Sequence, residues 1–360
     1  MTSQTVIINK NLTINVSDKN GTNENDKSYG GHRKIIKLRN DPPVSLMYNG
    51  NVEFEGISIE NLVHEFKKKK DLNKMKSVRT IRDEFIIFIS HETEFTDLNT
   101  YIMPIINEFK KEIKKEPLDK IIEIYEKRKI PKFLQKLPAF KTEFRDIIPP
   151  NAEFNEVNET LWEMFSWYLS YEGSNLIFSG SSNGNYYPSL FEVNIHCNDS
   201  GNLIYENIEE HEYCRKPFFK VFAQNREAYT YITGIDDELL EFIKIYIKEY
   251  DNEIVNDFKN YLINKNVENY DDIINKLELI IHYKHDNLNQ DINILRLDGM
   301  KDACYYLEYL PKDLLCFFGD FLVKSVALKQ RISDDIDSVS IETDIALMTN
   351  ATGFKWIENI

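Results

Sequence analysis

The chain has 360 residues and a formal charge of −15, with 42% apolar and 12% aromatic residues. This apolar content suffices for a hydrophobic core and excludes wholesale disorder, while the acidic balance argues against a general nucleic-acid binder. Four cysteines are too sparse for a disulfide scaffold, and no apolar run approaches the roughly 20 residues that cross a bilayer. The N-terminus lacks the basic start of a signal peptide, so we expect a soluble, cytoplasmic protein without membrane contact.

Short β-branched runs separated by turn residues predict strands in the first part of the chain. Residues 5–8 and 12–16 form one candidate hairpin, and residues 34–38 and 44–48 form another. From Ser58 the apolar spacing becomes that of a helix, with Ser58 as the candidate N-cap. A second helix is predicted after it, and residues 101–171 are again rich in helical patterns.

The second half of the chain returns to strands, then helices, then strands. The predicted elements are strands at 175–178, 190–195, 203–205 and 218–222, a long helical tract from about 227 to 328, and closing strands at 344–349 and 354–357. This order favours an α+β fold over alternating βαβ units. We expect a single domain over residues 1–360, with helix-rich insertions at about 101–171 and about 236–310.

Two motifs have structural explanations that are stronger than their catalytic ones. The segment from Gly180 to Gly184 fits the G-x-S-x-G pattern, but a nucleophile elbow needs a helix directly afterwards, and the following residues predict a strand. A β-hairpin turn is therefore expected. His196-Cys197, with His211 and Cys214, could supply zinc ligands, but neighbouring residues of a strand point to opposite faces. His282 and His285 share a helix face without a third ligand. We predict no metal site.

Three residues near the N-terminus suggest nucleophilic chemistry. Removal of Met1 would expose Thr2 with a hydroxyl and a free α-amine, which can act as the base for its own hydroxyl. Asp18 ends the second predicted strand, and Lys34 begins the third. A lysine beside the nucleophile favours the neutral amine and the developing alkoxide, while an aspartate anchors the lysine.

These segments resemble the N-terminal threonine hydrolases. Residues 11–18 resemble the second strand of proteasome β-subunits and HslV, and residues 34–41 resemble their catalytic-lysine strand. Residues 44–50 resemble the next strand, whose terminal glycine donates its N–H to the oxyanion. Residues 176–193 look like the central hairpin of the family, and 343–356 like its closing strands. The chain also resembles a bacterial proteasome-like family through stretches such as Met47-Tyr48-Asn49-Gly50-Asn51.

The resemblance implies a four-layer αββα sandwich of the N-terminal-nucleophile hydrolase type with helical insertions. It also implies Gly50 as the oxyanion donor, with Asn49 as the alternative, and Asp337 and Ser340 as residues that orient the amine. The sequence departs from the family at Ile341, where a glycine is usual, and at residues 223–226, where a serine-bearing turn is usual.

The leading hypothesis is amide-bond hydrolysis through an acyl-enzyme on Thr2, with a peptide or protein substrate and no cofactor. The resemblance also suggests a homo-oligomer, either a ring or a dimer. A small-amide hydrolase is one alternative. The other is a non-catalytic scaffold or binding protein that acts through its helical insertions.

Overall fold

A computed structural model gives the fold of most of the chain. The residues that it describes are 2–22, 28–29, 31, 33–54, 57–91, 106–107, 109–111, 161, 173–197, 203–333 and 338–358. The predicted insertion at 101–171 lies almost entirely outside the described residues.

The first of two large sheets contains the N-terminal and the C-terminal strands. It has five antiparallel strands in the order β12-β1-β2-β13-β14. Their bounds are Phe218–Ala223 (β12), Ser3–Asn9 (β1), Leu12–Asp18 (β2), Thr343–Thr349 (β13) and Gly353–Ile357 (β14). Because β1 is paired on both sides, the chain start is held inside the sheet rather than at its edge.

The second sheet also has five antiparallel strands, in the order β11-β10-β9-β6-β5. Their bounds are Leu203–His211 (β11), Ser189–Cys197 (β10), Ser174–Gly180 (β9), Pro43–Gly50 (β6) and Ile35–Asn40 (β5). Gly180 and Ser189 are partners in the β9–β10 ladder, so residues 181–188 connect two antiparallel strands. The hairpin explanation of the G-x-S-x-G segment is confirmed.

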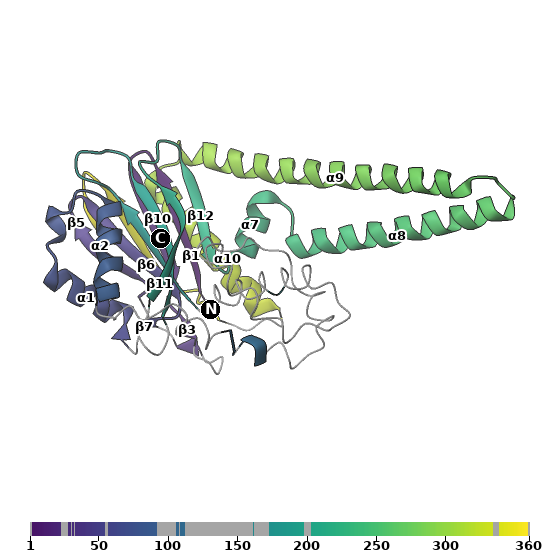
Figure 1. Cartoon of the computed structure of the whole chain (residues 1–360). Coiled ribbons are helices and arrows are strands. Elements are labelled where there is room, and N and C mark those ends of the chain that lie inside the picture. Colours follow the sequence, from purple (N-terminus) through teal and green to yellow (C-terminus); the bar gives the residue numbers. More distant parts are fainter. Residues whose placement is uncertain are drawn as a thin grey trace.

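The two sheets face each other through a shared apolar cluster. Val6 and Ala346 from the first sheet pack there with Met47 and Ile177 from the second. Such interdigitation of inner faces is how two sheets exclude water between them. Contacts of β2 with β5 and with β9 also join the two sheets, and Figure 1 shows the sheets lying against each other.

Helices cover the outer faces of both sheets. On the second sheet, α2 (Val78–His91) packs on β9 and β10, and α1 (Ile59–Lys69) contacts β5 and α2. The N-cap of α1 is Ser58, whose side chain accepts a hydrogen bond from the backbone N–H of Asn61, as predicted. On the first sheet, α10 (Lys312–Ile332) packs on β1 and β2, and α7 (Arg226–Thr233) packs against α10 in the same apolar cluster. The α+β class with two antiparallel sheets is thus confirmed.

Helices α8 (Asp237–Asn264) and α9 (Tyr270–Leu307) form a long hairpin. The hairpin extends away from the sheets (Figure 1), and we call it the arm. The predicted helical tract over residues 227–328 is helical and is divided into separate helices, because Gly234 ends α7 in the left-handed conformation and the chain turns between α8 and α9. Pro311 then marks the start of α10. The remaining described elements are the short pairs β3 (Gly21–Thr22) with β4 (Ser28–Tyr29) and β7 (Glu53–Phe54) with β8 (Ile57–Ser58), and a 3₁₀ helix, η1 (Leu72–Lys74), between α1 and α2. No helix among the described residues is long and apolar enough to cross a membrane.

Candidate active site

The structure brings together the three residues that the sequence singles out near the N-terminus. Lys34 Nζ donates hydrogen bonds to Thr2 Oγ1 at 2.6 Å and to Asp18 Oδ1 at 2.8 Å. All three residues are buried, with Asp18 fully enclosed and Thr2 8% exposed. The ammonium therefore bridges a hydroxyl and a carboxylate, so that it polarises the Thr2 hydroxyl while its charge is balanced.

The strand pairing explains why these residues meet. Gln4 pairs with Ser17, so Thr2 lies beside the end of β2, where Asp18 is the last residue. Lys34 stands directly before β5 in the other sheet, and its carbonyl accepts a hydrogen bond from Tyr48 N at 3.2 Å. The Lys34 side chain thus reaches from the second sheet to Thr2 and Asp18 at one end of the first sheet.

Backbone amides hold the Asp18 carboxylate in place. Its Oδ1 accepts from Ser3 N at 3.1 Å, and its Oδ2 accepts from Asn20 N at 3.1 Å and from Ser340 N at 3.4 Å. These three backbone donors fix the orientation of the carboxylate relative to Lys34. Burial lowers the pKa of Lys34 from its ordinary value, and the charge of Asp18 opposes this shift. The lowered pKa makes Lys34 a readier proton donor than an exposed lysine.

A polar network beside the site fixes β1 against β6. Gln4 Nε2 donates to Tyr48 O at 2.9 Å and to Ser17 Oγ at 3.1 Å. Gln4 Oε1 accepts from Asn49 Nδ2 at 3.0 Å. Because these side chains are buried and paired, they restrain the position of Thr2 relative to the strand that ends at Gly50.

The remaining predicted site residues differ in where they lie. Gly50 ends β6 with a φ of 85°, and a Cβ there would meet Gly173 O at 2.2 Å, so only glycine fits. No hydrogen bond between Gly50 or Asn49 and Thr2 is found among the described residues, and the oxyanion role stays a prediction. Ser340 reaches Asp18 through its backbone N–H, whereas its hydroxyl accepts from Glu342 N at 3.0 Å. Asp337 lies outside the described residues.

Two glutamines lie next to the site. Gln224 belongs to the departure at residues 223–226 that the sequence revealed, whereas Gln330 was missed. Gln224 N donates to Thr2 O at 3.0 Å, and the side chain of Gln224 accepts from Gln330 Nε2. Gln330 Oε1 in turn accepts from Ser338 N at 3.1 Å and from Val339 N at 3.0 Å. Gln330 is 6% exposed and lies on the apolar face of α10. A glutamine in phase with an apolar helix face was the signal available in the sequence.

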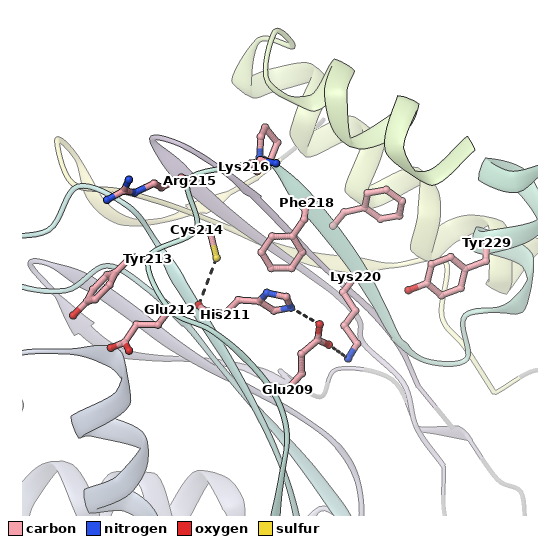
Figure 2. Close-up of a pocket in the computed structure, with 12 residues that line it drawn as sticks. Glu209, His211, Glu212, Tyr213, Cys214, Arg215, Lys216, Phe218, Lys220 and Tyr229 are labelled. Carbon is pink, nitrogen blue, oxygen red and sulfur yellow. Dashed lines mark hydrogen bonds and ion pairs between the residues drawn. The ribbon is translucent and has the colours of Figure 1, made fainter. Parts of the chain in front are cut away.

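A separate pocket of about 690 Å³ opens near the connection between β11 and β12. Figure 2 shows its ionic side chains. His211 Nε2 hydrogen bonds with Glu209 Oε1, and Lys220 Nζ donates a hydrogen bond to Glu209 Oε2. Lys220 pairs with Glu192 as well, so it links strands of both sheets. Phe218, which lines this pocket, pairs with Ile8, whereas Ala223 at the other end of β12 pairs with Ser3. The pocket and Thr2 therefore lie toward opposite ends of the same strands.

The chemistry of this pocket is that of a balanced ion cluster. Hydrogen bonding from His211 and Lys220 holds the pKa of Glu209 at about 2. Burial raises the pKa of the Cys214 thiol to about 12, and its sulfur faces His211 O at 3.5 Å. A thiol with such a pKa is protonated at neutral pH and is a poor nucleophile or metal ligand. Among the described residues, no group of three or more potential metal ligands is found.

Comparisons with known proteins assign no family to the chain. No protein-family model matches it, and no curated protein matches it. Solved structures that align with it include Anbu (ancestral beta-subunit) from Yersinia bercovieri, at 10% identity and a TM-score of 0.33, covering 99% of this chain and 86% of that one. An Anbu (Gly-1) mutant from Hyphomicrobium sp. strain MC1 aligns at 11% identity and a TM-score of 0.34, covering 99% and 87%.

The predicted membership in a bacterial proteasome-like family is therefore wrong. A member is expected to match a family model or a curated protein, and neither match exists. TM-scores of 0.33 and 0.34 are too low to support any conclusion about function. The assignment had rested on short strand motifs and a few residue positions, and β-branched runs of this kind recur in unrelated sheets.

Proposed function

We propose that the protein is a threonine-type amide-bond hydrolase that uses Thr2 after removal of Met1. The observation that carries this proposal is the bridge of Lys34 between Thr2 Oγ1 and Asp18 Oδ1 in a buried setting. A structural lysine–aspartate pair could exist without a hydroxyl at 2.6 Å from the ammonium. The hydrogen bond from the Lys34 ammonium to the Thr2 hydroxyl stabilises the negative charge that develops on Oγ1 when the hydroxyl loses its proton during attack.

In the proposed reaction, Thr2 Oγ1 attacks the carbonyl carbon of the scissile amide. The α-amine of Thr2, directly or through a water, accepts the hydroxyl proton and passes it to the leaving amine. Lys34 stabilises the developing alkoxide and favours the neutral amine, and Asp18 holds Lys34. Water then hydrolyses the acyl-enzyme, which releases the acid and restores Thr2.

The strand motifs of the sequence suggest the supporting groups. We propose the Gly50 N–H as the oxyanion donor, since loss of one such donor commonly costs about 3–4 kcal/mol of transition-state stabilisation. Ser340, through its backbone, and Asp337 are proposed to order the region around the amine. We further propose that the two sheets and their covering helices constitute an αββα sandwich of the N-terminal-nucleophile type, with peptides as substrates.

Turnover of fluorogenic peptides and of small amides by the purified full-length protein tests the proposal. Wild type is expected to release the fluorophore, and Thr2→Ala is expected to be inactive. The matched control is Thr13→Val, because the Thr13 hydroxyl is buried without a partner among the described residues and lies on β2. Activity that survives Thr2→Ala would refute the proposal. Cleavage of small amides alone would favour a small-amide hydrolase.

A non-catalytic binding protein is the second candidate, and the exposed apolar surface of the arm favours it. The two functions are separable: the catalytic proposal predicts acylation at Thr2, whereas a scaffold predicts none. Both can hold for one chain, because the arm and Thr2 lie in different parts of the fold.

A further inference from the structure

The arm exposes more apolar surface than its own folding explains. Its internal core, near the tip, consists of Val255, Leu262 and Ile274 with a few partly buried neighbours. Most of the large apolar side chains that are exposed among the described residues lie on α8 and α9. Soluble proteins rarely leave contiguous apolar patches of this kind uncovered, and larger ones mark interaction sites.

One face of α8 carries a regular stripe, which we call the α8 stripe. Its members recur at helical spacings of three and four and are Leu239, Ile243, Tyr246 and Tyr250. Phe242 lies next to them, and its ring stacks on Tyr246 with centroids 6.4 Å apart. Tyr246 is 61% exposed and Tyr250 is 56% exposed, so the stripe faces away from the arm core.

The charge beside the stripe restricts what can cover it. Helices α8 and α9 carry twice as many acidic as basic residues, and exposed Glu249 and Glu253 flank the stripe. A second copy would bring the same negative charge to the contact, and anionic membranes or nucleic acids would be repelled. A basic partner gains both apolar burial and ion pairing.

We propose that the α8 stripe is a docking surface for an amphipathic helix whose apolar side is flanked by lysine or arginine. Spacings of three and four residues are those through which helix recognises helix. The first four turns of α8 are roughly 20 Å long, which matches three to four turns of a partner helix. Burying the exposed aromatic rings and aliphatic side chains of this face would cover several hundred Å² on the arm, which approaches the roughly 800 Å² per partner of a standard interface.

The probe for this surface is a synthetic peptide of about three heptads with leucine at the apolar positions and lysine at the others. Two control peptides have glutamate in place of lysine, or the same leucine and lysine residues in scrambled order. Binding to the full-length protein is measured by fluorescence anisotropy at low and high salt. We expect the lysine peptide alone to bind, with at least tenfold weaker affinity at high salt.

Variants of the arm decide whether binding occurs at the stripe. Tyr246→Ser combined with Tyr250→Ser is expected to weaken peptide binding at least tenfold, and Glu249→Gln with Glu253→Gln to reduce its salt dependence. Tyr283→Ser is the matched control, because Tyr283 is 65% exposed on α9 and lies off the stripe. Circular dichroism and sedimentation of each variant establish that the fold and the oligomeric state are retained.

Each of three results would overturn the proposal. The first is equal binding of the lysine and scrambled peptides, and the second is unchanged affinity of the double tyrosine variant. The third is a wild-type dimer that the tyrosine substitutions dissociate, which would assign the stripe to a second copy. None of these measurements depends on Thr2, so their outcome is independent of the proposed hydrolase activity.

Discussion

The Thr2 site and the arm differ in which side chains they bury: the site buries polar groups, and the arm exposes apolar ones. At the Thr2 site, polar and charged groups are buried and each is paired, as with Lys34 between Thr2 and Asp18. On the arm, apolar rings such as that of Tyr246 stand in solvent. Buried charges without partners and exposed apolar faces both cost free energy. The polar groups of the first region find their partners among the described residues of the chain, whereas the proposed role of the second requires a partner protein.

The largest expected effect concerns the chain start. An N-terminal extension ahead of Met1 would keep the Thr2 nitrogen in a peptide bond, so the base of the proposed reaction would be lost. We expect amide hydrolysis to fall by about 10⁴-fold or more, as when a catalytic nucleophile or its base is removed. The same extension placed after Ile360 is the control. Equal activity of the two proteins would break the link between Thr2 and catalysis.

The second prediction concerns the buried pair at the same site. Lys34→Met leaves the Asp18 carboxylate buried without its cation, so the free energy of unfolding should fall by about 3–5 kcal/mol. Combining Lys34→Met with Asp18→Asn should restore much of this loss, because no uncompensated charge remains. Denaturant titration of both singles and the double measures the coupling. Strictly additive losses would contradict the pairing.

Gln330 tests how far the site depends on its surroundings. Gln330→Ala removes the acceptor for Ser338 N and Val339 N and the donor to Gln224. We expect a loss of about 1–3 kcal/mol of unfolding free energy, the usual cost of leaving buried polar groups unpaired. The rate of acylation at Thr2 should also fall. Gln330→Glu is the companion variant, since a carboxylate keeps the acceptor but cannot donate to Gln224.

The pocket cluster gives a pH-dependent prediction. The pKa of Glu209 is depressed from its ordinary 4.5 to about 2, so the folded state binds fewer protons than the unfolded chain between these values. Its stabilisation is therefore present above pH 4.5 and is lost as the pH falls toward 2. After discounting for solvent screening, we expect about 1–2 kcal/mol in neutral solution. Unfolding of Glu209→Gln at neutral and at acid pH measures it, and an unchanged difference between wild type and variant would refute it.

The smallest effect is expected on the arm. Tyr246→Ser with Tyr250→Ser removes two exposed rings, so the free energy of unfolding should change by no more than about 0.5 kcal/mol per site. If peptide binding is lost while the free energy of unfolding stays the same, the two tyrosines serve binding, whereas Lys34 also stabilises the fold. A large loss of stability would show instead that the rings contribute to the fold.

Features set by residues close together in the sequence could be predicted, whereas contacts between residues far apart in the sequence could not. The hairpin of β1 and β2 follows from adjacent β-branched runs and a turn, and Asp18 and Lys34 lie at strand ends that such patterns reveal. Gln330 meets Gln224 across 106 residues, and no local pattern specifies that contact. The turn of the arm was also missed. It relies on Asn266 and Asn269 with φ values of 49° and 61°, a conformation that asparagine permits but does not dictate.

The family assignment failed for a related reason. The strand motifs around Lys34 identify a sheet and the ends of its strands, but they do not identify ancestry. The same motifs placed Thr2, Asp18 and Lys34 near one another because strand register is a physical constraint. The geometry therefore supports a site whose evolutionary origin the sequence motifs did not reveal.

Intact-mass analysis of the purified protein tests the central claim most directly. The protein is treated with an electrophile that closes a ring with both the hydroxyl and the α-amine of an N-terminal threonine. We expect a chain without Met1 that gains one adduct, mapped to Thr2, and no adduct in Thr2→Ala. Retention of Met1, or the absence of an adduct on a chain that begins at Thr2, would contradict it.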